Sequence, residues 1–185
     1  MRRVALALAV LVAACGGTSG TTSPETWANR LCTDLTAWLG TVKAGADQLR
    51  QAQVRATTLT QARAQLVHYL DTAVAATDQL LAHTSTKPKV ADGKALNNEI
   101  RAGIEQARMV FEHGRAQAGA LPTNDPNAYR QQAQALGTEI ARAGTGLQQR
   151  VSTATRRYRS SEIDRALHEQ PACRRLATET GTGSL

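Results

Sequence analysis

Cysteines and histidines have the widest chemistry of the side chains in this 185-residue chain, since they bind metals, act as nucleophiles or form cross-links. No histidine lies three residues after a glutamate, and neither His-Glu-x-x-His nor Gly-x-Ser-x-Gly occurs. The patterns of helical metal sites and serine hydrolases are therefore missing. We expect a non-enzymatic protein without a metal or other cofactor. The cysteines and histidines of the chain are Cys15, Cys32, Cys173, His68, His83, His113 and His168.

The first fourteen residues have the pattern of an export signal. Arg2 and Arg3 precede eleven apolar or small residues, Val4 to Ala14. At about 1.5 Å per residue this run spans ~16 Å, about half of a ~30 Å hydrocarbon core, which is too short for a stable membrane span. We expect residues 1–14 to be removed as a signal peptide. A twin-arginine signal is the alternative, but the residues after Arg3 do not fit that motif.

The end of this run, Val12-Ala13-Ala14-Cys15, resembles a bacterial lipobox. The resemblance implies cleavage before Cys15 and a diacylglyceryl anchor on its thiol, which places the protein at the outer face of the bacterial cytoplasmic membrane. An ordinary secretory signal with a coincidental cysteine is the alternative. The segment from Trp27 to Trp38, with Cys173, also resembles a loose group of small helical lipoproteins of actinobacteria, and this resemblance implies no particular activity.

If Cys15 is acylated, two cysteines remain, Cys32 and Cys173. In an exported protein such a pair predicts a disulfide bond. A loop of about 140 residues constrains the unfolded chain by nearly 5 kcal/mol in the entropic description. A free thiol pair or a metal site is the alternative, which the lack of a nearby histidine or third cysteine disfavours.

Two groups of residues are candidates for ligand or partner contacts. Trp27 and Trp38 share one face of a predicted helix, where core anchoring is favoured and a ligand clamp is the alternative. The basic group near the C terminus contains Arg156, Arg157 and Arg159, which predicts contact with anionic lipid headgroups or wall polymers. Its alternative is a solvated helix face with local ion pairs. Nucleic acid is not expected, because no aromatic residues interleave with the basic ones.

Net charge supports the same partners. The formal charge of +7 falls to +5 when Arg2 and Arg3 leave with the signal. Partners of the mature protein would therefore be the membrane, through its diacylglyceryl anchor, and an envelope protein or an anionic wall polymer.

Composition and periodicity predict the elements that position these residues. Apolar residues make up 42% of the chain but aromatic residues only 3%, which favours helices. Apolar spacings of three and four, with capping and proline signals, predict helices over residues 24–53, 58–83, 92–120 and 126–160. The expected caps are Ser23, Asp92 and Asp125, with Ser160 or Ser161 capping a possible short fifth helix.

We therefore predict an all-α fold, an up-down-up-down four-helix bundle with a possible short fifth helix. Its domain covers residues 24–176, after a lipidated flexible tether at 15–23 and before a disordered tail at 177–185. This topology brings Cys32 and Cys173 to the same end of the bundle.

Glycines inside the predicted helices are unexpected, because each destabilises a helix by up to about 1 kcal/mol relative to alanine. Close helix approach is one interpretation, and a groove that admits a ligand is the other. The favoured function is that of a lipid-anchored surface protein acting by protein, cell-wall or lipid contacts. The alternative is a binding module for a small ligand or lipid, with an apolar cavity lined by Trp27, Trp38, Phe111 and Leu136. The glycines are Gly40, Gly45, Gly103, Gly114, Gly119, Gly137, Gly144 and Gly146.

Overall fold

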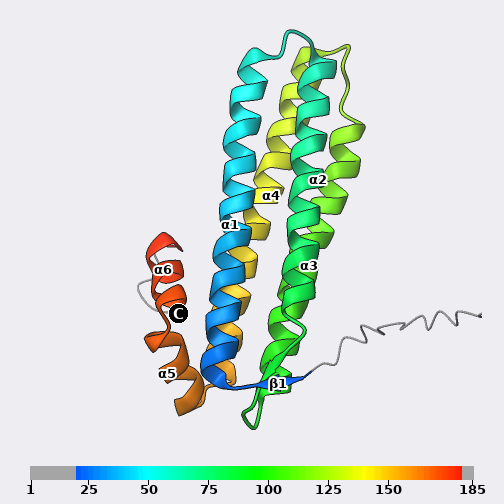
Figure 1. The fold of residues 1–185 in the computed structure, drawn as a ribbon. Coiled ribbons are helices and arrows are strands. Elements are labelled where there is room, and N and C mark those ends of the chain that lie inside the picture. The colour runs from blue at the N-terminus through cyan, green and yellow to red at the C-terminus, as the bar shows by residue number, and fades with distance from the viewer. Residues whose placement is uncertain (1–19, 181–185) are drawn as a thin grey trace, which may run out of the picture.

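The structure, a computed structural model, describes residues 20–180, which form six helices and two short strands (Figure 1). The helices are α1 (Pro24–Arg55), α2 (Leu59–His83), α3 (Gly93–Gly119), α4 (Pro126–Arg157), α5 (Ser161–Glu169) and α6 (Pro171–Thr180), and the strands are β1 (Thr21–Thr22) and β2 (Lys87–Pro88). The predicted all-α class and the short fifth helix are confirmed.

Side-chain caps explain where several helices begin. The side-chain oxygens of Ser23, Asp125 and Ser160 each accept a hydrogen bond from a backbone N–H in the first turn that follows. Such caps contribute about 1 kcal/mol each. Asp92 precedes α3 as expected, but its side chain makes no capping hydrogen bond.

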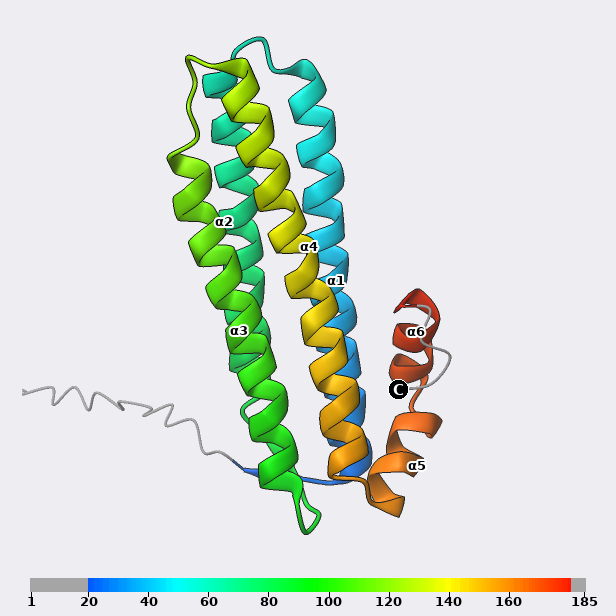
Figure 2. The ribbon, with the colours of Figure 1, turned by 180° about the vertical axis from the view of Figure 1, so that it is seen from behind.

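The four long helices run alternately up and down the bundle (Figures 1 and 2). Backbones approach closely between α1 and α2, between α2 and α3, and between α3 and α4. The backbones of α1 and α4 have fewer close approaches, so this fourth side of the bundle is the most open. Both α5 and α6 pack against α1, beside the half of α1 where that helix begins (Figure 1).

The core is concentrated toward that same half of α1. Six apolar residues of α1 are buried, and the last of them is Trp38; the residues from Leu39 to Arg55 are half-buried or exposed. Burying a large apolar side chain contributes about 1.5 to 3 kcal/mol. The largest fully buried apolar side chains are Phe111, Leu70, Leu96, Ile100, Ile104 and Ile163.

Part of the segment expected to be a flexible tether is bonded to the bundle. β1 pairs in parallel with β2, which lies in the connection between α2 and α3. The backbone N–H of Lys87 donates to the carbonyl of Gly20 at 3.2 Å, and that of Lys89 donates to Thr22 at 2.8 Å. The description as a flexible tether therefore does not apply to residues 20–22.

The helix α6 was not predicted. Pro171 indicates a break in the helical pattern, but in the structure it occupies the first position of a new helix, as Pro24 and Pro126 do. The tail expected to be disordered from residue 177 is helical to Thr180. Residues 181–185 lie outside the described residues.

Candidate functional site

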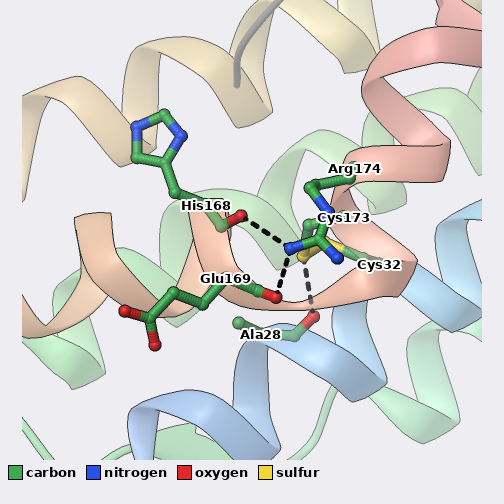
Figure 3. The surroundings of a disulfide bond; sticks show 6 residues. All are labelled: Ala28, Cys32, His168, Glu169, Cys173 and Arg174. Atoms are coloured by element: carbon green, nitrogen blue, oxygen red, sulfur yellow. Dashed lines mark hydrogen bonds between the residues drawn. A yellow bond between two sulfur atoms is a disulfide. The ribbon is translucent and has the colours of Figure 1, made fainter.

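A disulfide bond joins Cys32 on α1 to Cys173 on α6, with the two Cα atoms 4.9 Å apart (Figure 3). Both residues are buried. Cys173 Sγ lies 3.4 Å from the carbonyl oxygen of Ala28, a contact without a donated proton because a disulfide sulfur carries no hydrogen. The predicted pair is confirmed, and it fixes the last described helix against the first. Cys15 lies outside the described residues.

The turn between α5 and α6 is held by Arg174, the residue after Cys173 (Figure 3). Its Nη1 donates to the backbone carbonyl of Glu169 at 2.7 Å and to that of His168 at 3.4 Å. These carbonyls belong to the last turn of α5, where a cation is favourable. Arg174 therefore holds the turn within the α5–α6 arm, and the disulfide joins that arm to α1.

Trp27 and Trp38 point into the bundle. Trp27 Nε1 donates to Asn97 Oδ1 on α3 at 3.2 Å, and Trp38 Nε1 donates to Thr77 Oγ1 on α2 at 2.9 Å. The Trp38 ring lies 6.4 Å from that of Phe111, between centroids and at a tilt. Both indoles are buried with their N–H groups bonded, which favours core anchoring over a ligand clamp.

The three arginines of the predicted basic group lie near the junction of α4 and α5 and have different surroundings. Arg156 and Arg159 line a polar cavity of about 260 Å³, whereas Arg157 does not. Arg157 Cζ lies 5.7 Å from the ring centroid of Tyr158 instead, a cation–π contact. The complete lining is Ser152, Thr155, Arg156, Arg159, Asp164, Leu167 and His168.

Two different interactions hold the arginines of this cavity. Arg159 Nε donates to the Asp164 carboxylate, and this hydrogen bond raises the pKa of the Arg159 guanidinium further above its usual value. Arg156 makes no ion pair among residues 20–180, and its Nη1 donates to Ser152 Oγ at 2.6 Å. Arg156 therefore keeps an uncompensated positive charge at the surface, available to an anionic partner.

An apolar cleft lies where α1, α4 and α6 meet, on the open side of the bundle. Its volume is about 130 Å³. Of the residues in the expected cavity lining, Trp38 lines this cleft, while Trp27, Phe111 and Leu136 do not. The lining consists of Leu35, Trp38, Leu39, Gly144, Leu147, Gln148, Val151 and Leu176.

A larger groove of about 520 Å³ runs between α3 and α4. Charges of both signs line it, from Glu99, Glu139, Arg142 and Arg150. Its lining is therefore partly charged, unlike that of the apolar cleft on the other side of α4.

The helical glycines differ in how closely neighbouring helices approach them. An added Cβ at Gly103 would lie 3.2 Å from a methyl of Leu147, and one at Gly114 would lie 3.2 Å from a methyl of Leu136. These two glycines allow α3 and α4 to approach closely. A Cβ at Gly144 would meet no atom within 4 Å, and the same is true of Gly40, Gly119, Gly137 and Gly146.

Within residues 20–180, no cluster of three or more His, Cys, Asp or Glu side chains is arranged to hold a metal ion. None of the helices in that range combines the length and apolarity needed to cross a membrane.

No protein-family profile, curated protein or solved structure matches this chain. The class established by the fold is therefore a helical bundle with a disulfide-fixed C-terminal arm.

Sequence reasoning expected an apolar cavity in the alternative function, but of the residues that line the apolar cleft it named Trp38 alone. Its lining comes from three helices, and one of them, α6, was not predicted. One signal in the sequence did point to it. Gly144 lies inside a long helix, where glycine is unfavourable unless packing or a ligand requires it.

Proposed function

We propose that this protein is a lipid-anchored, non-enzymatic helical bundle on the outer face of the bacterial cytoplasmic membrane, which acts through contacts with protein, cell wall or lipid. The observation that carries the proposal is the Cys32–Cys173 disulfide. It is the kind of bond that oxidising compartments maintain, and the third cysteine of the chain, Cys15, directly follows the apolar run.

The anchor is tested by fatty-acid labelling. We expect the wild-type chain, produced in a bacterium that matures lipoproteins, to incorporate an alkyne-bearing fatty acid and to sediment with membranes. Cys15→Ala should abolish the labelling, because it removes the acylated thiol. The matched control, Cys32→Ala with Cys173→Ala, should keep the label. A Cys15→Ala chain that still labels, or an unlabelled wild type, contradicts the proposal.

The contact surface that we propose is the polar cavity between α4 and α5 that Arg156 and Arg159 line. Arg156 has no ion-pair partner among the described residues, and Arg159 pairs with a single carboxylate, that of Asp164. Anionic lipid headgroups or wall polymers gain about 1 kcal/mol per basic residue close to them.

This surface is tested by retention on isolated cell envelopes. We expect Arg156→Gln with Arg159→Gln to weaken retention at ~0.1 M salt and to make little difference at ~1 M, where the Debye length falls to about 3 Å. The matched control also removes two charges, Lys43→Gln with Arg55→Gln, at exposed positions in the second half of α1. Equal loss in both variants would show that net charge alone, and not this cavity, is responsible.

A second function is favoured by one specific observation, the apolar cleft between α1, α4 and α6. In this function the bundle binds a small apolar ligand. Binding of an apolar ligand in such a cleft is favourable, because the ligand and the apolar lining are both removed from water.

A further inference from the structure

We infer that the cleft between α1, α4 and α6 binds a single hydrocarbon chain, such as the acyl chain of a fatty acid or phospholipid. The inference rests on the second proposed function, ligand binding, and does not depend on acylation of Cys15. Its basis is the shape and chemistry of the cleft, the position of Gly144, and the covalent attachment of the wall formed by α6.

The lining chemistry excludes a polar ligand. Among the eight residues of the cleft, Gln148 has the one side chain with an uncommitted polar group, because Trp38 Nε1 already donates to Thr77. A polar ligand would lose its hydration and find only the Gln148 amide as a side-chain partner, which is unfavourable. A hydrocarbon loses nothing by leaving water, so the cleft selects an apolar group.

The dimensions favour a chain over a compact ring. The volume of about 130 Å³ is near that of a cavity of about 150 Å³ that admits benzene. On α4, however, the lining extends from Gly144 to Val151, which is about 10 Å of helix at 1.5 Å per residue. A volume this small distributed over two helical turns is narrow and elongated, and an unbranched chain fits it better than a ring.

Gly144 has no packing reason to be glycine. Gly103 and Gly114 let α3 and α4 approach, but a side chain at Gly144 would meet open space. Gly144 also lines the cleft, so the missing side chain leaves room that a ligand can occupy. Gly137 has the same open surroundings on the same helix but lines neither the cleft nor the α3–α4 groove, which makes it a matched control.

The third wall of the cleft is fixed by the disulfide. Leu176 lines the cleft and lies three residues after Cys173, and residues three apart share one face of a helix. The bond from Cys173 to Cys32 therefore holds Leu176 close to Leu35 and Trp38. The cleft is a preformed site and does not need α6 to move before a chain can enter.

The experiment uses the full chain in phosphatidylcholine vesicles. One set of vesicles contains a free fatty acid with a diazirine near the end of its chain, and the other contains a phospholipid whose acyl chain has the same diazirine. After irradiation, cross-linked peptides are mapped by mass spectrometry. We expect adducts on the α4 peptides that contain Leu147 and Val151 and on the α6 peptide that contains Leu176. The set that gives these adducts identifies the source of the chain.

The glycine variants decide whether the cleft is responsible. Gly144→Leu should reduce these adducts by about tenfold, which is ~1.4 kcal/mol of binding free energy, because its side chain occupies the cleft. Gly137→Leu should leave them unchanged within about twofold, or ~0.4 kcal/mol. Equal adducts in both variants, equal loss in both, or wild-type adducts confined to other peptides would each overturn the inference. Circular dichroism of both variants confirms that each is folded. The adducts are read on α4 and α6, so their absence is distinguishable from a lack of acylation at Cys15.

Discussion

Removing the disulfide should lower the free energy of unfolding by about 5 kcal/mol. Cys32 and Cys173 are 141 residues apart, and the loop-closure entropy for a loop of this length amounts to about 5 kcal/mol at 25 °C. We propose the double variant Cys32→Ala with Cys173→Ala, because alanine leaves no unpaired hydroxyl in these buried positions.

The full effect requires that the α5–α6 arm folds together with the bundle. The arm buries Ile163, Ala166 and Leu176 in the same core as the four long helices, so its release would expose core residues. We therefore expect a single cooperative transition in the variant. If the arm detached on its own, the transition would split, and the loss would be limited to the contacts of the arm.

The assay is urea unfolding, followed by the fluorescence of Trp27 and Trp38. For a slope of about 2 kcal/mol per molar urea, a loss of 5 kcal/mol moves the midpoint down by about 2.5 M. Wild-type protein treated with a reductant is the control for the cavity left by alanine, and its midpoint should fall similarly. A midpoint shift of less than about 0.5 M, which is ~1 kcal/mol, would refute this reasoning.

Four further predictions concern single residues. Trp38→Phe removes the donor to Thr77 and should cost about 1 to 3 kcal/mol in urea unfolding. Gly137→Ala should stabilise the protein by up to about 1 kcal/mol, measured as a rise in melting temperature of about 2 to 4 °C. Gly114→Ala should raise the melting temperature less than Gly137→Ala, or lower it, because the new Cβ would lie 3.2 Å from a Leu136 methyl. An equal rise in both variants would contradict the packing argument. A hydrogen bond from its own backbone N–H, and then one from a serine hydroxyl, lower the pKa of Glu25 from its usual 4.5. The ionised Glu25 carboxylate therefore stabilises the fold fully above pH 4.5, and this stabilisation is lost as the pH falls through the lowered pKa. In Glu25→Gln, the free energy of unfolding measured in urea should depend less on pH in this acidic range.

The features that could be predicted from the sequence are local or covalent. The starts of α1, α4 and α5 follow from Ser23, Asp125 and Ser160, whose side chains bond to backbone only two or three residues away. The cysteine pair followed from a count of thiols and from the end of the bundle at which each was expected. Such inferences require only neighbouring residues and the order of helices.

The features that were missed depend on distances between helices. The pairing of β1 with β2 joins residues 66 apart, Thr21 with Lys87, and nothing in a run of threonines indicates where such a partner lies. The cleft depends on the distance between α4 and α1, which cannot be predicted from the spacing of apolar residues along either helix. The glycines show the same limit, since Gly114 and Gly144 are both glycines inside long helices, but an added Cβ would meet a neighbouring helix only at Gly114.

The open side of the bundle and the disulfide are parts of one arrangement. Loops connect α1 to α2, α2 to α3 and α3 to α4, but none connects α4 back to α1, so this side depends on side-chain packing. There α6 supplies Leu176, beside the stretch of α1 where buried residues end at Trp38. Because Cys32 lies within two turns of Trp38, the disulfide holds α6 at the height of the cleft. Reduction should therefore destabilise the wall formed by Leu176 together with the rest of the fold.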